Sequence, residues 1–299
     1  MTWLSDDAVT RLRTVADVPD LSGTRYRLVR EIARGGMGVV YEAEDLELQR
    51  RVALKVLATE QASPAAAERM QREARVMARL EHPGIVPLHD AGVLADGRVF
   101  YAMKLVRGRL LNEVDAAPTE MLRLFLRVCE GVAFAHAQNV LHCDLKPSNI
   151  MIGQFGEVLV MDWGVAKSAG EAAPGGTRGF MPPEQERGEA LDPAADVHAL
   201  GATLRAVLSR SEDARPARID RRLAAIIAKA TAVDCVDRYA DAGALALDVA
   251  RYLDGEPVAA YRETAFERAG RWLERNRTLV AVVAAYLVMR TIVLLVAHR

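Results

Sequence analysis

The segment "HCDLKPSNIMI", residues 142–152, places several chemically capable side chains in one short stretch. It contains Asp144, Lys146 and Asn149, and a proline between them prevents a continuous helix. The strand pair expected next, "NIMI" and "EVLVMDWG", brings a second aspartate, Asp162, eighteen residues after the first. Carboxylate and amide oxygens are ligands that Mg²⁺ prefers, and Mg²⁺ bridges nucleotide phosphates. Each residue alone could form a turn, but together they predict a magnesium-nucleotide site.

Two upstream segments could also contact phosphates. The first is "ARGGMGVV", residues 33–40, whose glycines let backbone amides approach a phosphate closely. An ordinary hairpin turn is the alternative, and the absence of a following Gly-Lys-Ser/Thr excludes a Walker loop. The second is Lys55 in "VALK", where an ammonium among apolar neighbours needs a carboxylate. Glu73 can supply it, although its charged run "QREAR" could equally be a solvated helix face.

The elements that position these residues are of two kinds. Strands are predicted at "YRLVREI", "VVYEAE" and "RVALKVL", followed by a helix at 64–80 and by strands in "GIVPLHDAGVL" and "RVFYAMKLV". Helical patterns then dominate residues 119–254. The sequence therefore predicts an α+β fold with a small β-rich lobe followed by a larger α-helical lobe.

Composition limits the classes of function. The chain has 39 basic and 40 acidic residues, so its net charge gives no argument for nucleic acid as a partner. Its three cysteines, Cys129, Cys143 and Cys235, form no CxxC pair, which predicts neither a zinc site nor a disulfide framework and fits a reducing compartment. The first residues lack the apolar core of a secretory signal.

With these motifs in this order, residues 26–254 resemble the bacterial serine/threonine protein kinases of the Hanks (eukaryotic-like) type. The matching motifs are the glycine-rich loop, Lys55, Glu73, "HCDLKPSN", "DWG" and, at 182–184, "PPE". The resemblance implies ATP-dependent phosphorylation of serine or threonine hydroxyls on proteins, with Mg²⁺ or Mn²⁺ as the metal. Lys146, two positions after Asp144, is what marks the serine/threonine class.

The resemblance also implies a role for each motif residue. Asp144 would accept the proton of the acceptor hydroxyl, and Lys146 would neutralise the γ-phosphate. Lys55 would hold the α- and β-phosphates, with Glu73 orienting it. Asn149 and Asp162 would be the metal ligands. Asp196 would brace the catalytic loop, and Arg238 would pair with Glu184. The residues implied to bind the nucleotide are Ala33, Arg34, Gly35, Gly36, Met37, Gly38, Val40, Ala53, Lys55, Met103, Lys104, Asn149 and Asp162.

Several positions depart from the family pattern. Ala33 replaces the first loop glycine, Trp163 the usual phenylalanine, and Lys104 the acid usual after the gatekeeper-like Met103. Cys143 stands where an arginine usually binds a phosphorylated activation loop, so control by loop phosphorylation is in doubt. The region between about 209 and 218 is short for substrate docking. Two alternatives follow: a nucleotide-binding pseudokinase scaffold at the membrane, or a membrane-tethered structural module with a degenerate kinase fold.

The C-terminal segment "LVAVVAAYLVMRTIVLLVA", residues 279–297, is apolar except for Arg290 and Thr291. As a helix it would be about 28 Å long, close to the thickness of a bilayer core, and it is predicted to be a transmembrane helix. Arginines precede it at 268, 271, 275 and 277, which predicts a single-pass protein of the inner membrane with its kinase domain in the cytoplasm. A helix docked on the kinase lobe is the alternative.

These expectations divide the chain into four parts. An N-terminal extension covers 1–25, the kinase domain covers 26–254 with its lobes meeting at 106/107, a basic juxtamembrane linker covers 255–278, and the span covers 279–297. The expected partners are ATP, a protein with a serine or threonine acceptor, and the membrane. A homodimer is left open.

Overall fold

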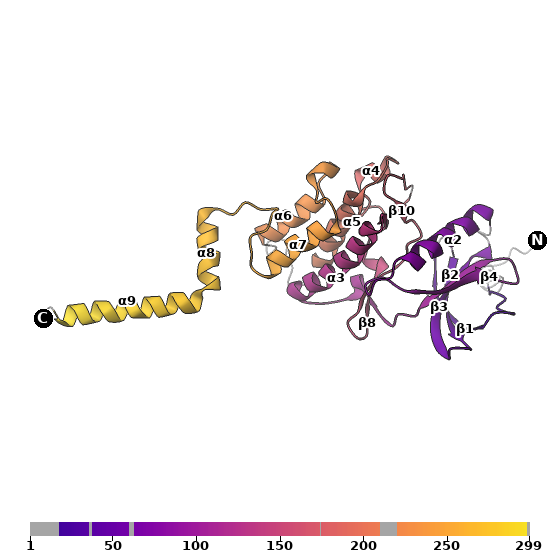
Figure 1. Cartoon of the computed structure of the whole chain (residues 1–299), viewed down its shortest axis with the longest axis horizontal. Coiled ribbons are helices and arrows are strands. Elements are labelled where there is room, and N and C mark those ends of the chain that lie inside the picture. Colours follow the sequence, from indigo (N-terminus) through magenta and orange to yellow (C-terminus); the bar gives the residue numbers. More distant parts are fainter. Residues whose placement is uncertain (1–17, 36–37, 60–62, 174, 210–219, 298–299) are drawn as a thin grey trace, which may run out of the picture.

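The chain folds into two lobes that lie side by side (Figure 1). The computed structural model describes residues 18–35, 38–59, 63–173, 175–209 and 220–297. The first lobe is built on a β-sheet and the second on helices, so the predicted α+β bilobal architecture is confirmed.

The small lobe contains a five-stranded antiparallel sheet in the order β1-β2-β3-β5-β4. In β2, Val39, Tyr41 and Ala43 alternate with more polar positions and are buried on one face of the sheet. Because side chains alternate along a strand, Val40 and its partner in β3, Lys55, lie on the opposite face. That face looks toward the large lobe. The strands are β1 Tyr26–Arg34, β2 Gly38–Asp45, β3 Arg50–Leu57, β4 Leu88–Val93 and β5 Val99–Lys104.

Helix α2, Pro64–Arg79, packs on this sheet as predicted. Ser63 caps its first turn by accepting a hydrogen bond from the backbone nitrogen of Ala66, and Pro64 occupies the first helical position. Met70, Ala74 and Met77 form its buried stripe, and the carboxylate of Glu73 lies on the same side. The helix therefore carries one charged group into an otherwise apolar contact.

The large lobe is organised around α3, Pro118–Ala137, whose inner side chains, including Phe125, Val128 and Val132, are fully buried. Helices α4 Pro183–Glu186, α5 Pro193–Leu208, α6 Arg221–Ala230 and α7 Ala242–Leu253 complete it. Two small sheets carry the loops of interest. One joins β6 Gly108–Leu110, β8 Ile150–Gly153 and β9 Val158–Val160, and the other pairs β7 Val140–Leu141 with β10 Lys167–Ser168.

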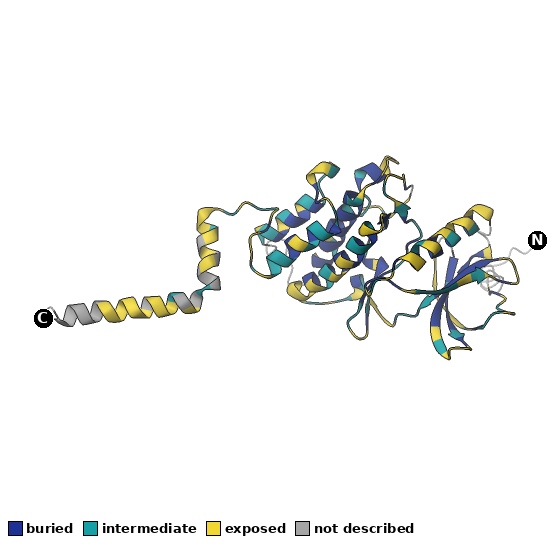
Figure 2. Cartoon of the chain, in the orientation of Figure 1, coloured by how far each residue is buried: buried dark blue, intermediate teal, exposed yellow. Residues whose placement is uncertain are grey.

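The segment directly after α7 is hydrogen-bonded to the large lobe, and the helices that follow extend away from that lobe. Asp248 is buried and accepts hydrogen bonds from the backbone nitrogens of Ala259 and Ala260, at 2.6 and 3.0 Å, and from the hydroxyl of Tyr239 at 2.8 Å. Helices α8 Ala265–Arg275 and α9 Arg277–Ala297 then project away from the lobe (Figure 1). Most of their described residues are exposed (Figure 2).

Two expectations concern this region. The expected linker at 255–278 contains a helix, α8, which Thr264 and Glu267 start as a reciprocal capping box. Among the residues that the structure describes, no helix combines the length and the apolar character needed to cross a membrane. The transmembrane helix expected at 279–297 is therefore not confirmed. Arg290 interrupts this apolar run, and the side chains of 291–297 lie outside the described residues.

Candidate active site

The loop after β7 holds Asp144 and Lys146 in direct contact. The Lys146 Nζ atom donates to Asp144 Oδ2 at 2.7 Å and to the hydroxyl of Thr177 at 2.7 Å. The Thr177 hydroxyl in turn donates to Asp144 Oδ1 at 2.8 Å. Both carboxylate oxygens of Asp144 are thus oriented, at the place where the segment after β10 passes the loop.

Asn149 and Asp162 bring oxygen atoms to the same place. The amide nitrogen of Asn149 donates to the backbone oxygen of Asp144 at 2.9 Å, so the amide oxygen faces the other way. Asp162 follows β9 with φ +61°, an unusual backbone conformation for a residue with a side chain, and its carboxylate is half exposed. Burial tends to raise the pKa of Asp162, but the charge and hydrogen bond of Lys55, together with the nearby His142 and Lys146, outweigh burial and hold the pKa below its usual value. Asp162 is therefore ionised at neutral pH.

Lys55 and Glu73 form the predicted ion pair, with Lys55 Nζ 2.8 Å from Glu73 Oε1. The two side chains are only 12% and 3% exposed. Burial alone would lower the pKa of Lys55, but nearby groups, including the carboxylates of Glu73 and Asp162, raise it above its usual value. Lys55 also lies 3.5 Å from Asp162, so a strand, a helix and the turn after β9 meet at one ammonium.

Some of the other residues expected to bind the nucleotide lie on the same face of the sheet as Lys55. Val40 pairs with Lys55 and Ala53 pairs with Met103, so these positions share the face toward the large lobe. Gly38 has no room for a side chain, because a Cβ would lie 2.5 Å from the carbonyl oxygen of Val56.

The remaining expected residues contribute less directly. Ala33 and Arg34 pair with β2, and the Arg34 guanidinium bonds to Glu31 at 2.8 Å. The backbone nitrogen of Gly35 closes the loop on the carbonyl of Gly38 at 2.9 Å. The Lys104 ammonium lies 3.5 Å from Glu157. Gly36 and Met37, both expected at this site, lie outside the described residues.

Asp196 supports the catalytic loop from below, as expected. It is buried and accepts hydrogen bonds from the backbone nitrogens of His142 and Cys143 at 2.8 and 2.9 Å, and it contacts the ring of His136 at 3.0 Å. Cys143 has φ +64°, a conformation that costs about 1–2 kcal/mol for a residue with a side chain. Asp196 therefore fixes a strained backbone directly before Asp144.

Cys143 itself is packed and inert. Its side chain is buried, and burial raises the pKa of the thiol, so the reactive thiolate is suppressed. The backbone oxygen of Cys143 accepts a hydrogen bond from the side chain of Gln185 at 2.8 Å, and the same nitrogen reaches the carbonyl of Gly175 at 2.6 Å. Gln185 thus ties the segment after β10 to the catalytic loop.

Sequence reasoning missed two residues of this site, Gln185 and Tyr101. Gln185 directly follows "PPE", a position that gave no chemical signal of its own. The hydroxyl of Tyr101 donates to Glu73 Oε1 at 2.7 Å. Tyr101 could have been found from the sequence, because it lies two positions before Met103 in β5 and strand periodicity places both side chains on one face.

Glu184 and Arg238 form the expected pair within the large lobe. Two guanidinium nitrogens of Arg238 donate to the two carboxylate oxygens of Glu184 at 2.6 and 2.9 Å. Arg238 also donates to three backbone oxygens, those of Ala194, Ala232 and Val233. A fully satisfied buried guanidinium of this kind locks the start of α4 onto α5 and the turn before α7.

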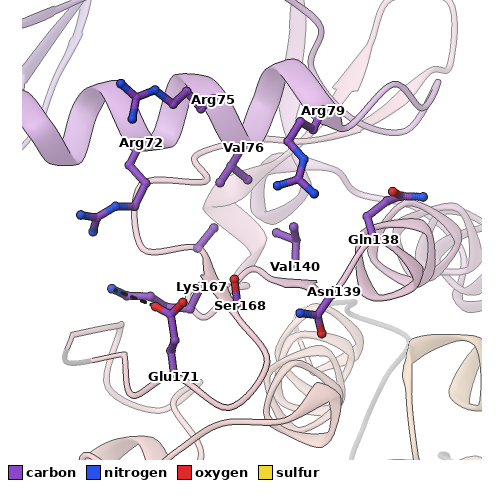
Figure 3. A pocket seen from close by; sticks show the side chains of 11 residues that line it. Arg72, Arg75, Val76, Arg79, Gln138, Asn139, Val140, Lys167, Ser168 and Glu171 are labelled. Carbon is purple, nitrogen blue, oxygen red and sulfur yellow. Dashed lines mark ion pairs between the residues drawn. The ribbon is translucent and has the colours of Figure 1, made fainter.

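A cavity of about 460 Å³ lies outside this cluster, between α2 and β10. Arg72 and Arg79 point from α2 toward it, and Lys167 faces them from β10, 3.9 Å from Glu171 (Figure 3). The rest of its wall is formed by Arg75, Val76, Gln138, Asn139, Val140, Ala166 and Ser168. None of the residues expected to bind the nucleotide lines this cavity, and its walls carry an excess of positive charge.

Comparison with known proteins identifies what this arrangement resembles. Residues 26–239 match the family described as the protein kinase domain. A probable serine/threonine-protein kinase of Streptomyces coelicolor is 32% identical over 281 residues, covering 81% of this chain and 42% of that protein. The serine/threonine-protein kinase PknA of Mycobacterium tuberculosis is 44% identical over 198 residues, covering 60% of this chain and 46% of PknA. The chain thus spans less than half the length of these curated relatives.

A solved structure agrees with the architecture. The crystal structure of the PknI kinase domain of Mycobacterium tuberculosis superposes with a TM-score of 0.64 at 26% sequence identity. The match covers 79% of this chain and 99% of that domain, so both lobes take part.

We expect Glu184→Gln to destabilise the protein at pH 7 by about 3 kcal/mol, because it leaves a buried guanidinium without its counter-charge. Arg238 holds the pKa of Glu184 below its usual value despite burial, which acts to raise it. The contribution of Glu184 is therefore fully present above the usual glutamate pKa of about 4.3 and is lost as pH falls through its lower pKa in the folded protein. Urea unfolding should show that the difference in the free energy of unfolding between variant and wild type becomes smaller as the pH falls from 7 to 3.5.

Glu189→Gln is the matched control, since Glu189 makes an exposed pair with Arg187. It should leave the free energy of unfolding unchanged throughout this pH range. An equal loss for Glu184→Gln at every pH would contradict the role assigned to its charge.

Proposed function

The chain belongs to the protein kinase family, and from that premise we propose that it transfers the γ-phosphoryl group of ATP to serine or threonine hydroxyls of proteins. One observation carries the proposal: Lys55, Glu73 and Asp162 form a continuous ionic cluster beside the oriented carboxylate of Asp144. Phosphoryl transfer requires such positioned charge and little covalent chemistry from the protein. The names of the relatives support the serine/threonine class.

The transfer itself would proceed at Asp144. The acceptor oxygen attacks the γ-phosphorus in line, the bond to the leaving ADP oxygen breaks, and the hydroxyl proton passes to the Asp144 carboxylate. Lys146, which lies 2.7 Å from Asp144, would donate to the γ-phosphate oxygens. Thr177 bonds to both residues and marks where the acceptor hydroxyl would enter.

ATP would bind between the lobes. Lys55 would donate to the α- and β-phosphates, while Glu73 keeps its ammonium in place. Ala53 and Met103 offer small and apolar surface to the base. Exclusion of water from this cleft would strengthen each of these charge interactions.

Asp162 and Asn149 are suitable ligands for Mg²⁺ or Mn²⁺. Both offer oxygen atoms, and Asp162 is held ionised. Within the described ranges no cluster of three or more His, Cys, Asp or Glu side chains could hold a metal ion by itself. A metal held by these one or two protein groups together with nucleotide phosphates would neutralise the charge of the transferred group.

A pseudokinase scaffold has less support. Pseudokinases are expected where a charged group of the site is missing, yet Lys55, Asp144 and Asp162 are all present, and Lys55 pairs with Glu73 as expected. The short docking region that favoured this alternative falls mostly on residues 210–219, which lie outside the described residues.

For the cellular location we propose the arrangement predicted from the sequence, a single-pass inner-membrane protein with its kinase domain in the cytoplasm. Support comes from the exposed apolar side chains of α9, including Val282, Tyr286 and Leu287, beside the arginine-rich sequence of α8. The same apolar surface would also suit a second copy of the chain, as in a homodimer.

Asp144→Asn should lower kcat by about 10²- to 10⁴-fold and leave the affinity for MgATP nearly unchanged, because Asp144 acts on the acceptor and not on the nucleotide. Asp162→Asn should instead weaken MgATP binding, since it removes a formal charge from the metal ligands. Transfer of labelled phosphate to a serine/threonine acceptor protein and calorimetric titration with MgATP measure the two effects. Asp254→Asn, an exposed position at the end of α7, is the control.

Wild-type turnover in Asp144→Asn would show that another group accepts the proton. Unchanged MgATP affinity in Asp162→Asn would remove the metal role from that residue.

The location is tested by fractionating the full chain beside a chain that ends at Arg277. We expect the full chain to stay with membranes after a carbonate wash and the shorter chain to be released. Equal release of both would mean that the C-terminal helix does not anchor the protein.

A further inference from the structure

Tyr101 lies at the centre of the small lobe and touches both members of the Lys55–Glu73 pair. It faces Lys55 across the β3–β5 ladder and is only 1% exposed. Its hydroxyl lies 2.7 Å from Glu73 Oε1, the same oxygen that Lys55 Nζ approaches at 2.8 Å. The Lys55 ammonium also lies 5.4 Å from the centroid of the tyrosine ring. One side chain therefore contacts the cation through its ring and the carboxylate through its hydroxyl.

The Tyr101 hydroxyl supplies the Glu73 carboxylate with a hydrogen-bond donor. Glu73 is almost completely buried, and a buried carboxylate is costly unless several donors satisfy it. Burial raises the pKa of Tyr101 well above its usual value, so the hydroxyl keeps its proton across the physiological range. Hydrogen bonds to ionised acceptors are also roughly twice as strong as neutral ones. The contact thus holds Glu73, and with it α2, against the sheet.

The side of α2 that lines the cavity beside β10 offers no alternative to this attachment. Arg72 and Arg79 point toward the cavity beside β10, where Lys167 faces them (Figure 3). Arg72 pairs with Glu68 on its own helix at 3.0 Å, and Lys167 lies 3.9 Å from Glu171, so no ion pair among the described residues joins α2 to β10 across the cavity. The catalytic loop also offers no arginine for a loop phosphate, because residue 143 is a cysteine. The buried side of α2 is therefore where the position of Glu73 must be fixed.

We infer that Tyr101 is a positioning residue for phosphoryl transfer, which acts through Glu73 to keep Lys55 in its phosphate-binding place in the unphosphorylated chain. This rests on the proposed kinase activity. Tyr101 does not touch the reacting atoms, so its contribution must appear in the handling of ATP and not of the acceptor.

The test is Tyr101→Phe, which removes the hydroxyl and keeps the ring that fills the core. We expect kcat/KM for ATP to fall about tenfold, the loss typical of one charge-assisted hydrogen bond, with KM for the acceptor protein unchanged. The matched control is Tyr26→Phe. Tyr26 is also buried in the small lobe and donates to a carboxylate, Asp90, at 2.8 Å, but none of its hydrogen bonds or ring contacts within the described part of the chain involves a site residue. It should lower thermal stability comparably and leave kcat/KM unchanged.

A double-mutant cycle separates positioning from general stability. In a Glu73→Gln background, Tyr101→Phe should change kcat/KM by less than about twofold, because the group through which it acts has already been altered. Losses that simply multiply would indicate a structural role and overturn the inference, as would a Tyr101→Phe enzyme with wild-type kcat/KM. Calorimetric titration with MgATP compares the same four proteins, the wild type, the two single variants and the double variant, by affinity and without turnover. A wild-type chain that binds MgATP but transfers no phosphate would contradict the kinase activity and leave the binding comparison able to decide the role of Tyr101.

Discussion

The buried ion pair between Lys55 and Glu73 is the interaction on which the rest of the structure depends. Removing two charges from water costs several kcal/mol, and their attraction offsets this only when further partners satisfy them. Here those partners come from different elements: Tyr101 from β5 and Asp162 from the turn after β9. The pair itself joins β3 to α2, and the contact of Lys55 with Asp162 links both elements to the turn after β9. The small and the large lobe therefore share one ionic cluster.

Much of the small lobe could be predicted because its signals are local. Strands with alternating apolar residues and a proline-started helix appear within short windows of sequence, and β1–β3 and α2 follow them closely. The strands β6, β7 and β10 span only two or three residues, too few for any periodic pattern, and they form because distant segments meet. The helix α8 was missed for another reason. The capping residues Thr264 and Glu267 indicate a helix start, but the arginines of this segment were interpreted as the flank of a membrane span.

In the site, the charged residues were predictable, including Glu73 and Asp196, which orient others, whereas the neutral side chain of Gln185 was not. A lysine on an apolar strand needs a carboxylate, which made Glu73 a candidate, and the family resemblance favoured this pairing over a solvated helix face. Gln185, which holds the backbone of Cys143, is a neutral side chain with an unremarkable neighbourhood in sequence. Trp163 raises a different point. It is buried beside His142, with ring centroids 4.6 Å apart, and its indole nitrogen has no hydrogen-bond partner among the described residues.

The central claim is that the site is assembled in the unmodified chain, without a phosphate on the segment after β10. The most direct measurement is the time course of phosphoryl transfer by protein that has been treated with a phosphatase and freed from it. The contacts of Glu73 and Cys143 predict linear product formation from the first seconds, at the same rate as untreated protein. A lag that disappears after preincubation with MgATP would contradict the account, because it would show that the chain must phosphorylate itself before the site is complete.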